Sequence, residues 1–132
     1  MSTRALCVIK GADEEIAVIY RHYDGNPAWF GKELAKFLDG FQVVNGLANQ
    51  TGKIANGMEC LAAQIVAALK TSAGNVYLYS AGTRNIGEEY TYIVEQAKDY
   101  SILLTVSSYD DRIFEGSPEE FLMLEAINQI KE

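Results

Sequence analysis

The sequence predicts an α+β domain built on an antiparallel β-sheet of five to six strands, with helices packed on one face. Three observations support this class. Segments that alternate with a period of two occur as a pair early and as a trio later, segments with helical spacing stand apart from them, and the resulting order is ββααβββα. With 132 residues, 48% of them hydrophobic, the chain is expected to form one domain over residues 1–132.

The first part of the chain predicts a hairpin followed by a helix. Small and branched side chains alternate along residues 3–10, a polar turn follows, and residues 16–23 make the second strand. Asn26 can cap a helix and Pro27 suits its first turn, so a helix is expected over residues 27–39. Its apolar side chains recur at helical spacing: Phe30, Leu34, Phe37 and Leu38.

The middle of the chain combines an irregular segment with the clearest helix. Residues 41–57 contain several Asn and Gly residues and no period, which predicts a long connection with at most a short strand at 41–44. Asn56 followed by Glu59 predicts a capping box. Because the segment 61–69 is almost wholly apolar, we expect this helix to be buried on most sides.

The last part predicts three strands and a final helix. Residues 76–80, 89–96 and 101–108 are expected to form an antiparallel meander. Ser117, a proline after it and Glu120 predict a strongly capped helix start. The apolar stripe of that helix is Phe121, Leu124, Ile127 and Ile130.

The composition argues against several classes of partner. A net charge of -7 disfavours binding to duplex nucleic acid or to an anionic membrane. The chain has no run of 18 apolar residues and no leader-like start, so neither a membrane span nor a signal peptide is expected. Cys7 and Cys60 belong to no CxxC pair, which predicts two reduced, buried thiols in a cytoplasmic protein.

The segment 77–94 is the most informative part of the chain. Two aromatic strands flank a loop that holds two glycines, Arg84, Asn85 and two carboxylates. Either these polar groups meet one another in an elaborated hairpin loop, or they contact a ligand. The GK[ST] ending of a phosphate-binding P-loop is missing, so that motif is rejected.

Two further polar clusters stand near strand ends. In the first, Arg21 precedes His22, which is either a structural histidine or a general base with Asp24. In the second, Asp110 precedes Arg112, and adjacent acidic residues there give only a weak metal signal. The arginines either pair with carboxylates or converge on an anionic ligand, for which their planar donors are suited. No metal site and no cofactor is predicted, because His/Cys ligand spacing is lacking.

Three segments resemble a known family. YRHYDGNP (20–27), NGMECLAAQIVAALK (56–70) and YLYSAGTRNIGEEYTYIV (77–94) are similar to segments of phage and prophage proteins, and the chain resembles the phage anti-Thoeris sponges. The resemblance implies an antiparallel sheet with helices and a homodimer. It also implies a non-enzymatic role in the host cell cytoplasm, where the protein sequesters a cyclic ADP-ribose-type nucleotide. Higher homo-oligomers that hold cyclic oligonucleotides are a further implication.

The resemblance also implies roles for individual residues. Arginines would contact the pyrophosphate, an aromatic ring would stack on adenine, and Asp or Asn would contact ribose hydroxyls, in a pocket near the dimer interface. No residue is expected to be catalytic. The predicted ligand-binding residues are Arg21, Tyr23, Arg84, Asn85, Tyr90, Asp110 and Arg112.

Other functions remain open from the sequence. A small acidic phage protein that inhibits a host defence protein would also suit the net charge. A nucleotide hydrolase would use His22, Asp24 or the Glu88 and Glu89 pair as its base, although no complete nucleophile or metal constellation is present. A structural component of a phage is the fourth alternative.

Overall fold

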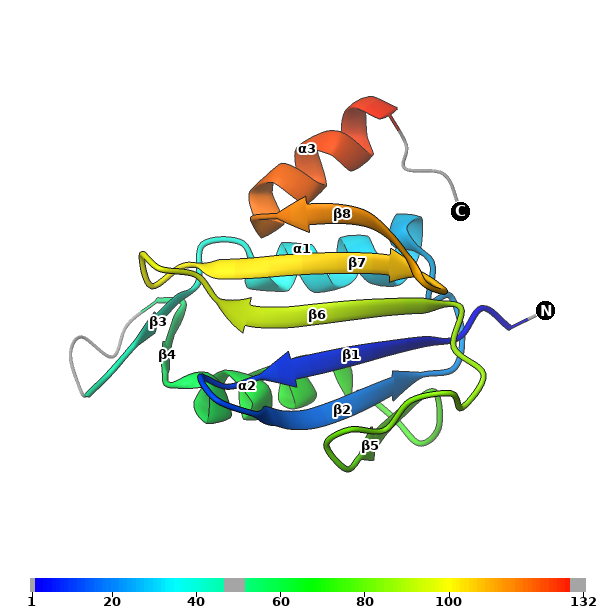
Figure 1. The fold of residues 1–132 in the computed structure, drawn as a ribbon, viewed down its shortest axis with the longest axis horizontal. Coiled ribbons are helices and arrows are strands. Elements are labelled where there is room, and N and C mark those ends of the chain that lie inside the picture. The colour runs from blue at the N-terminus through cyan, green and yellow to red at the C-terminus, as the bar shows by residue number, and fades with distance from the viewer. Residues whose placement is uncertain (1, 47–51, 129–132) are drawn as a thin grey trace.

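The structure, a computed structural model, describes residues 2–46 and 52–128. Its main sheet has six strands in the order β5-β2-β1-β6-β7-β8 (Figure 1). The α+β class is confirmed, with helices packed against the sheet. The strands are β1 (Ala5–Lys10), β2 (Glu15–Arg21), β5 (Val76–Tyr79), β6 (Tyr90–Gln96), β7 (Ile102–Ser108) and β8 (Asp111–Gly116).

The sheet is mixed rather than purely antiparallel. β1 pairs with β2 as the predicted antiparallel hairpin, but it pairs with β6 in parallel, from Ala5 opposite Tyr90 to Ile9 opposite Val94. The expectation of an antiparallel sheet was therefore wrong for this central pair. β1 is buried along nearly its whole length and β6 alternates between buried and half-buried side chains, so the pair lies in the interior of the sheet, which is the usual setting of parallel pairing.

The connection between β5 and β6 explains the strand order. β5 pairs with the far side of β2, with Tyr77 opposite Tyr20, so the predicted three-strand meander was wrong for its first member. The chain must then return to the opposite end of the sheet, where Tyr90 begins β6, and residues 80–89 make that return (Figure 1). The hairpin of β6 and β7 is confirmed, and β8 adds an edge strand that the sequence did not predict.

The helices share one face of the sheet, as predicted. A π-helical turn η1 (Pro27–Gly31) leads into α1 (Lys32–Leu38), which together match the expected first helix. α2 (Met58–Leu69) and α1 lie behind the sheet in Figure 1, and α3 (Pro118–Asn128) lies beyond β8. Side chains from all of these helices join one core with the inward side chains of the strands.

The helix starts differ in how well they were predicted. At α3, the Ser117 Oγ accepts the Glu120 N–H at 3.1 Å and the Glu120 carboxylate accepts the Ser117 N–H at 2.8 Å, so the predicted capping box is confirmed. At α2, Gly57 caps the helix instead of Asn56. The Asn56 side chain accepts the Gly46 N–H at 2.8 Å and thereby links the ends of two short parallel strands. These strands are β3 (Gln42–Val44) and β4 (Ile54–Asn56). In the last helix, Ile130 of the predicted apolar stripe lies outside the described residues.

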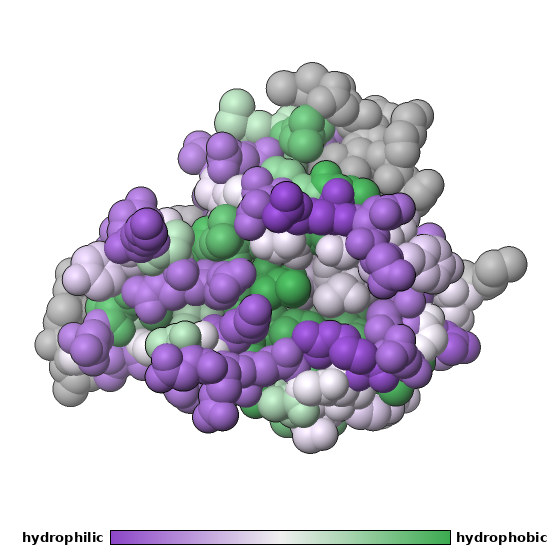
Figure 2. Space-filling model, in the orientation of Figure 1, coloured by the Kyte–Doolittle hydropathy of each residue, from purple (hydrophilic) through white to green (hydrophobic). Residues whose placement is uncertain are grey.

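Within residues 2–46 and 52–128, no helix covers the other face of the sheet. Leu6, Val8 and Val18 are nevertheless fully buried there, because Ile86 of the 80–89 connection packs against them. Figure 2 shows this face as largely hydrophilic around a hydrophobic centre. None of the helices in the described part of the chain is long and apolar enough to cross a bilayer.

Candidate functional site

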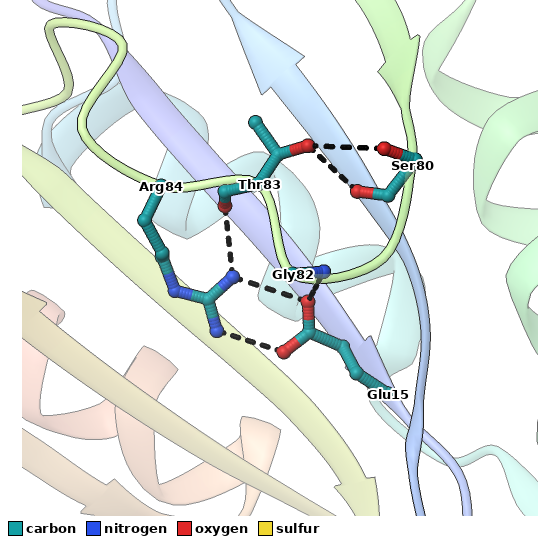
Figure 3. A network of polar contacts seen from close by, with 5 residues as sticks. All are labelled: Glu15, Ser80, Gly82, Thr83 and Arg84. Carbon is teal, nitrogen blue, oxygen red and sulfur yellow. Dashed lines mark hydrogen bonds and ion pairs between the residues drawn. The ribbon is translucent and has the colours of Figure 1, made fainter.

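The 80–89 connection is anchored to the first hairpin by one carboxylate. Arg84 donates from Nη2 and Nη1 to the two Glu15 carboxylate oxygens at 2.8 and 3.1 Å, and the Gly82 N–H donates to the same carboxylate (Figure 3). The Arg84 hydrogen bonds, joined by the one from Gly82, lower the pKa of the Glu15 carboxyl despite its partial burial. The Arg84 guanidinium is therefore committed to an intramolecular partner.

A second carboxylate organises the tip of the same connection. Glu88 accepts the backbone N–H groups of Asn85 and Ile86, both at 2.9 Å. Burial raises the pKa of this carboxyl, but the backbone donors outweigh burial and the net shift is downward. Asn85 has a φ of 61°, a left-handed conformation that Asn tolerates. The polar groups of the loop thus meet one another, which is the first of the two alternatives for this segment.

Arg21 lies on the helix-covered side of the sheet. Its Nη1 pairs with the Glu33 carboxylate at 3.0 Å, and its guanidinium lies 5.0 Å from the centre of the Phe30 ring. Its Nε donates to the Tyr23 carbonyl oxygen at 2.6 Å. Only 11% of the side chain is exposed, so Arg21 contributes to the packing of η1 and α1 against β2.

Arg112 lies on β8, the edge strand at the other side of the sheet from β2 and β5. It pairs with Glu115 at 3.1 Å, and 63% of its side chain is exposed. Four strand spacings of about 4.8 Å separate β8 from β2, so Arg112 lies roughly 19 Å from Arg21 across the sheet. Arg84 is held at Glu15, six residues along β2 from Arg21, which corresponds to about 20 Å. The predicted convergence of these arginines does not occur within one chain.

The remaining predicted ligand residues are also dispersed. Tyr90 is 1% exposed and belongs to the core, so its ring presents no face on which a ligand can stack. Tyr23 is exposed beyond the end of β2, where its N–H donates to the Asn75 side chain at 2.8 Å. Asp110 is exposed in the tight turn between β7 and β8.

The structure gathers a different group on the open face, which we call the Tyr20 cluster: Tyr20, His22, Tyr77, Tyr79 and Arg4. The Tyr20 ring centre lies 6.0 Å from that of Tyr77 and 5.9 Å from those of Tyr79 and His22. The Tyr20 hydroxyl and His22 Nδ1 form a hydrogen bond of 2.8 Å. Tyr20 is buried while Tyr77 and Tyr79 are exposed, so Tyr20 supports two rings that solvent and ligands can reach.

Arg4 supplies a positive charge to the cluster, as does Lys70, whose Nζ lies 5.5 Å from the centre of the Tyr77 ring. Burial raises the pKa of Tyr20, and the positive charge of Arg4 opposes that rise, so the guanidinium acts electrostatically on the Tyr20 hydroxyl. Across residues 2–46 and 52–128, no carboxylate lies in ion-pair range of the Arg4 guanidinium. Gly87 lets the guanidinium lie against the loop, since a Cβ at that position would be 2.5 Å from Arg4 Nη1. Arg4 is therefore available to an anion.

The sequence contained a signal for this cluster. Residues 77–79 alternate as Tyr-Leu-Tyr, and the second strand places Tyr20 and His22 on one face by the same alternation. Because residues 76–80 were expected to pair with residues 89–96, the sequence did not predict that they lie beside the second strand. Arg4 is likewise on the face of Leu6, by the period of the first strand.

A second, acidic hollow lies at the turn between β1 and β2. It encloses about 410 Å³ and is lined by Asp13, Glu14, Glu15 and Glu59, with Gly11, Ala12 and Ile16. Within the described residues, no three His, Cys, Asp or Glu side chains are arranged to hold a metal ion. The hollow is therefore described as a negatively charged surface and not as a metal site.

Comparison with known proteins identified no relative of this chain. No family model matches the chain. No curated protein and no solved structure matches it either. The assignment of function consequently depends on the geometry of the Tyr20 cluster and on the sequence resemblance.

Proposed function

We propose that this protein is a phage anti-defence protein that binds and sequesters a cyclic ADP-ribose-type nucleotide in the host cytoplasm, without hydrolysing it. The observation that carries the proposal is the Tyr20 cluster. It combines two exposed tyrosine rings with an arginine that has no carboxylate partner among the described residues. A base stacked on such a ring is stabilised by about 1–3 kcal/mol.

The cluster matches the chemistry of an adenine dinucleotide in two respects. The exposed rings of Tyr77 and Tyr79 offer apolar faces to a base, and Arg4 offers a planar pair of donors to a phosphate. His22, held by the Tyr20 hydroxyl, lies within 3.5 Å of the Ser2 hydroxyl and adds further polar groups at the rim. Because the cluster is an open surface and small ligands bind best in concave sites, a second copy of the chain is proposed to close it.

Thermal shift and calorimetry with cyclic ADP-ribose isomers test this proposal. A ligand at about 100 times its dissociation constant adds roughly 2.7 kcal/mol to the free energy of unfolding. Heating the complex and analysing the released nucleotide by mass spectrometry should return it unchanged. An altered nucleotide would refute sequestration, and the absence of a shift with every isomer would refute nucleotide binding.

Two matched pairs of variants locate the site. Arg4→Ala and Tyr79→Ala are expected to weaken binding by about five- to 150-fold, because each removes roughly 1–3 kcal/mol of contact. Arg112→Ala and Tyr109→Ala remove the same side chains from exposed positions at the opposite edge. Weaker binding in the second pair but not in the first would place the ligand elsewhere on the sheet.

The acidic hollow favours one alternative function. Its carboxylates, on a chain of net charge -7, form a surface that suits a basic patch on a host defence protein. In that case no nucleotide would shift the melting temperature. Association with the host protein would instead weaken when Asp13→Lys and Glu14→Lys reverse the local charge.

A further inference from the structure

The tip of the 80–89 connection holds three backbone donors around one carboxylate of the same chain. The N–H groups of Asn85 and Ile86 donate to the two Glu88 carboxylate oxygens, both at 2.9 Å, and the N–H of Glu88 acts on the same carboxyl. Asn85 and Gly87 have positive φ values of 61° and 102°, and residues in this conformation turn successive N–H groups to one side of a loop, where they form an anion-binding concavity. We call the N–H groups of Asn85, Ile86 and Glu88 the backbone nest.

The Glu88 carboxylate occupies this nest without a cation as partner. No ion pair in the described part of the chain includes it, so backbone N–H groups hold it. The other carboxylate that binds this connection is different, because Glu15 accepts two hydrogen bonds from the Arg84 guanidinium as well as one from the Gly82 N–H (Figure 3). Paired guanidinium donors are among the strongest partners of a carboxylate. Glu15 is therefore a fixed anchor, whereas Glu88 can be exchanged for another anion.

Arg4 provides a cation at the side of the nest. A Cβ on Gly87, the residue between Ile86 and Glu88, would lie 2.5 Å from Arg4 Nη1, so the guanidinium lies against the backbone of the nest. Among the described residues Arg4 forms no ion pair, either with Glu88 or with any other carboxylate. A phosphate offers more acceptor oxygens than a carboxylate, and a planar guanidinium is suited to bind two of them. A phosphate in place of the Glu88 carboxylate can therefore accept the N–H groups of the nest and the donors of Arg4 together.

The nest lies at the border of the Tyr20 cluster. Ile86 packs against the apolar group that includes Tyr20. Burial is the main cause that raises the pKa of the Tyr20 hydroxyl, and the negative charge of Glu88 adds to this rise while the positive charge of Arg4 opposes it. A phosphate held by the nest therefore lies next to the surface on which the base is proposed to stack.

We propose that the backbone nest is a phosphate subsite that the ligand-free chain fills with the Glu88 carboxylate, and that a phosphate of the bound nucleotide displaces this carboxylate and binds the nest and Arg4. The nucleotide in this statement rests on the proposed function, whereas the affinity of the nest for phosphate does not. A tethered competitor acts at an effective concentration on the order of millimolar or above. Glu88 therefore keeps free inorganic phosphate out of the subsite, and a nucleotide that also stacks its base can displace it.

Titration with inorganic phosphate, followed by the backbone amide resonances in NMR spectra, tests the subsite. Glu88→Ala empties the nest, so phosphate should shift the amide resonances of Asn85 and Ile86. It should also bind at least about tenfold more tightly than to the wild type, because the tethered competitor is gone. Adding Arg4→Ala to Glu88→Ala should weaken this binding by about fivefold or more, since a charged partner of the phosphate is lost. In the wild type, a cyclic ADP-ribose isomer that binds should shift the same two amide resonances.

Glu89→Ala is the matched control, because it removes the same charge from the neighbouring residue. The N–H of Glu89 donates to the Arg4 carbonyl oxygen, and the Glu89 carboxylate forms no ion pair within the residues that the structure describes. Its phosphate affinity should stay within about twofold of the wild type, because a charge outside the nest makes no direct contact with the phosphate. Glu88→Gln keeps the length of the side chain but offers one acceptor oxygen instead of two, so an intermediate affinity is expected. This variant decides alone if Glu88→Ala loses the circular dichroism of the native fold.

Three results would overturn the proposal. They are a phosphate affinity in Glu88→Ala no higher than in the wild type, an equal gain in Glu89→Ala, and shifts with either ligand confined to amides outside residues 85–88. The subsite and the nucleotide-binding function can fail separately. A wild type that binds cyclic ADP-ribose while its Glu88→Ala variant ignores phosphate would refute the subsite and leave the proposed function in place. A Glu88→Ala variant that takes phosphate into the nest, in a protein that ignores every cyclic ADP-ribose isomer, would do the reverse.

Discussion

Truncation of Glu15 to alanine tests whether one carboxylate holds the 80–89 connection across the open face. The variant removes the partner of Arg84 at 2.8 and 3.1 Å and the acceptor of the Gly82 N–H. Hydrogen bonds to a charged group contribute about 1.5–3 kcal/mol each. Because the Arg84 side chain is 37% exposed, solvent screens part of this, and we expect a loss of about 1–2 kcal/mol in the free energy of unfolding.

Urea denaturation followed by circular dichroism measures that loss. Arg112→Ala is the control, because it removes a guanidinium from an exposed ion pair with Glu115 and should cost about 0.5 kcal/mol or less. A double-mutant cycle of Glu15→Ala with Arg84→Ala should give a coupling energy of about 1 kcal/mol. A loss in Glu15→Ala no larger than in Arg112→Ala would refute the anchoring role of this carboxylate.

Three further outcomes are expected. The pKa of the Glu15 carboxyl is lower in the folded chain than in the unfolded chain. The ionised carboxylate therefore stabilises the fold at a pH above its unfolded pKa, and this stabilisation is lost as the pH falls through its folded pKa. The stability difference between wild type and Glu15→Gln should therefore shrink in acid. Gly87→Ala should destabilise the fold by about 1 kcal/mol or more and displace Arg4, because Gly87 has a φ of +102° and its Cβ would lie 2.5 Å from Arg4 Nη1. Burial raises the pKa of the Cys7 thiol to about 12, so a thiol reagent should label half-buried Cys60 and not Cys7 until the chain unfolds.

Each of these outcomes has its own control. A constant difference between wild type and Glu15→Gln down to strong acid would contradict the assigned pKa direction. Gly82→Ala has a similar φ of +87° but no atom within 4 Å of its Cβ, so it isolates backbone strain from the contact with Arg4. Equal labelling rates of Cys7 and Cys60 in the native protein would contradict the burial of Cys7.

The elements that could be predicted are those whose signals are local. The first hairpin, the helix after Pro27 and the capping box of Ser117 and Glu120 each depend on residues close together in sequence. β8 could not be predicted because its side chains are exposed or half-buried on both faces. Such a strand lacks the alternation of apolar and polar side chains by which a strand is recognised in a sequence. The order of the strands in the sheet could not be predicted either, because it depends on the path of residues 80–89.

The candidate site was harder to predict for a related reason. Tyr77 and Tyr90 both lie in alternating aromatic strands, yet Tyr77 is on the open face and Tyr90 is in the core. Alternation tells which residues share a face, but the face that the helices cover is decided by the whole fold. The ion pair of Arg84 with Glu15 likewise joins segments that are 69 residues apart in sequence.

The parallel pair at the centre of the sheet also constrains how the chain folds. Ala5 on β1 is paired with Tyr90 on β6, so β1 leaves the ribosome long before its central neighbour in the sheet has been synthesised. Contacts between segments so distant in sequence form slowly, because the long intervening loop must close first. Until β6 arrives, the β1 edge of the nascent hairpin is unpaired, and a chain cut before residue 90 would keep that edge open to aggregation.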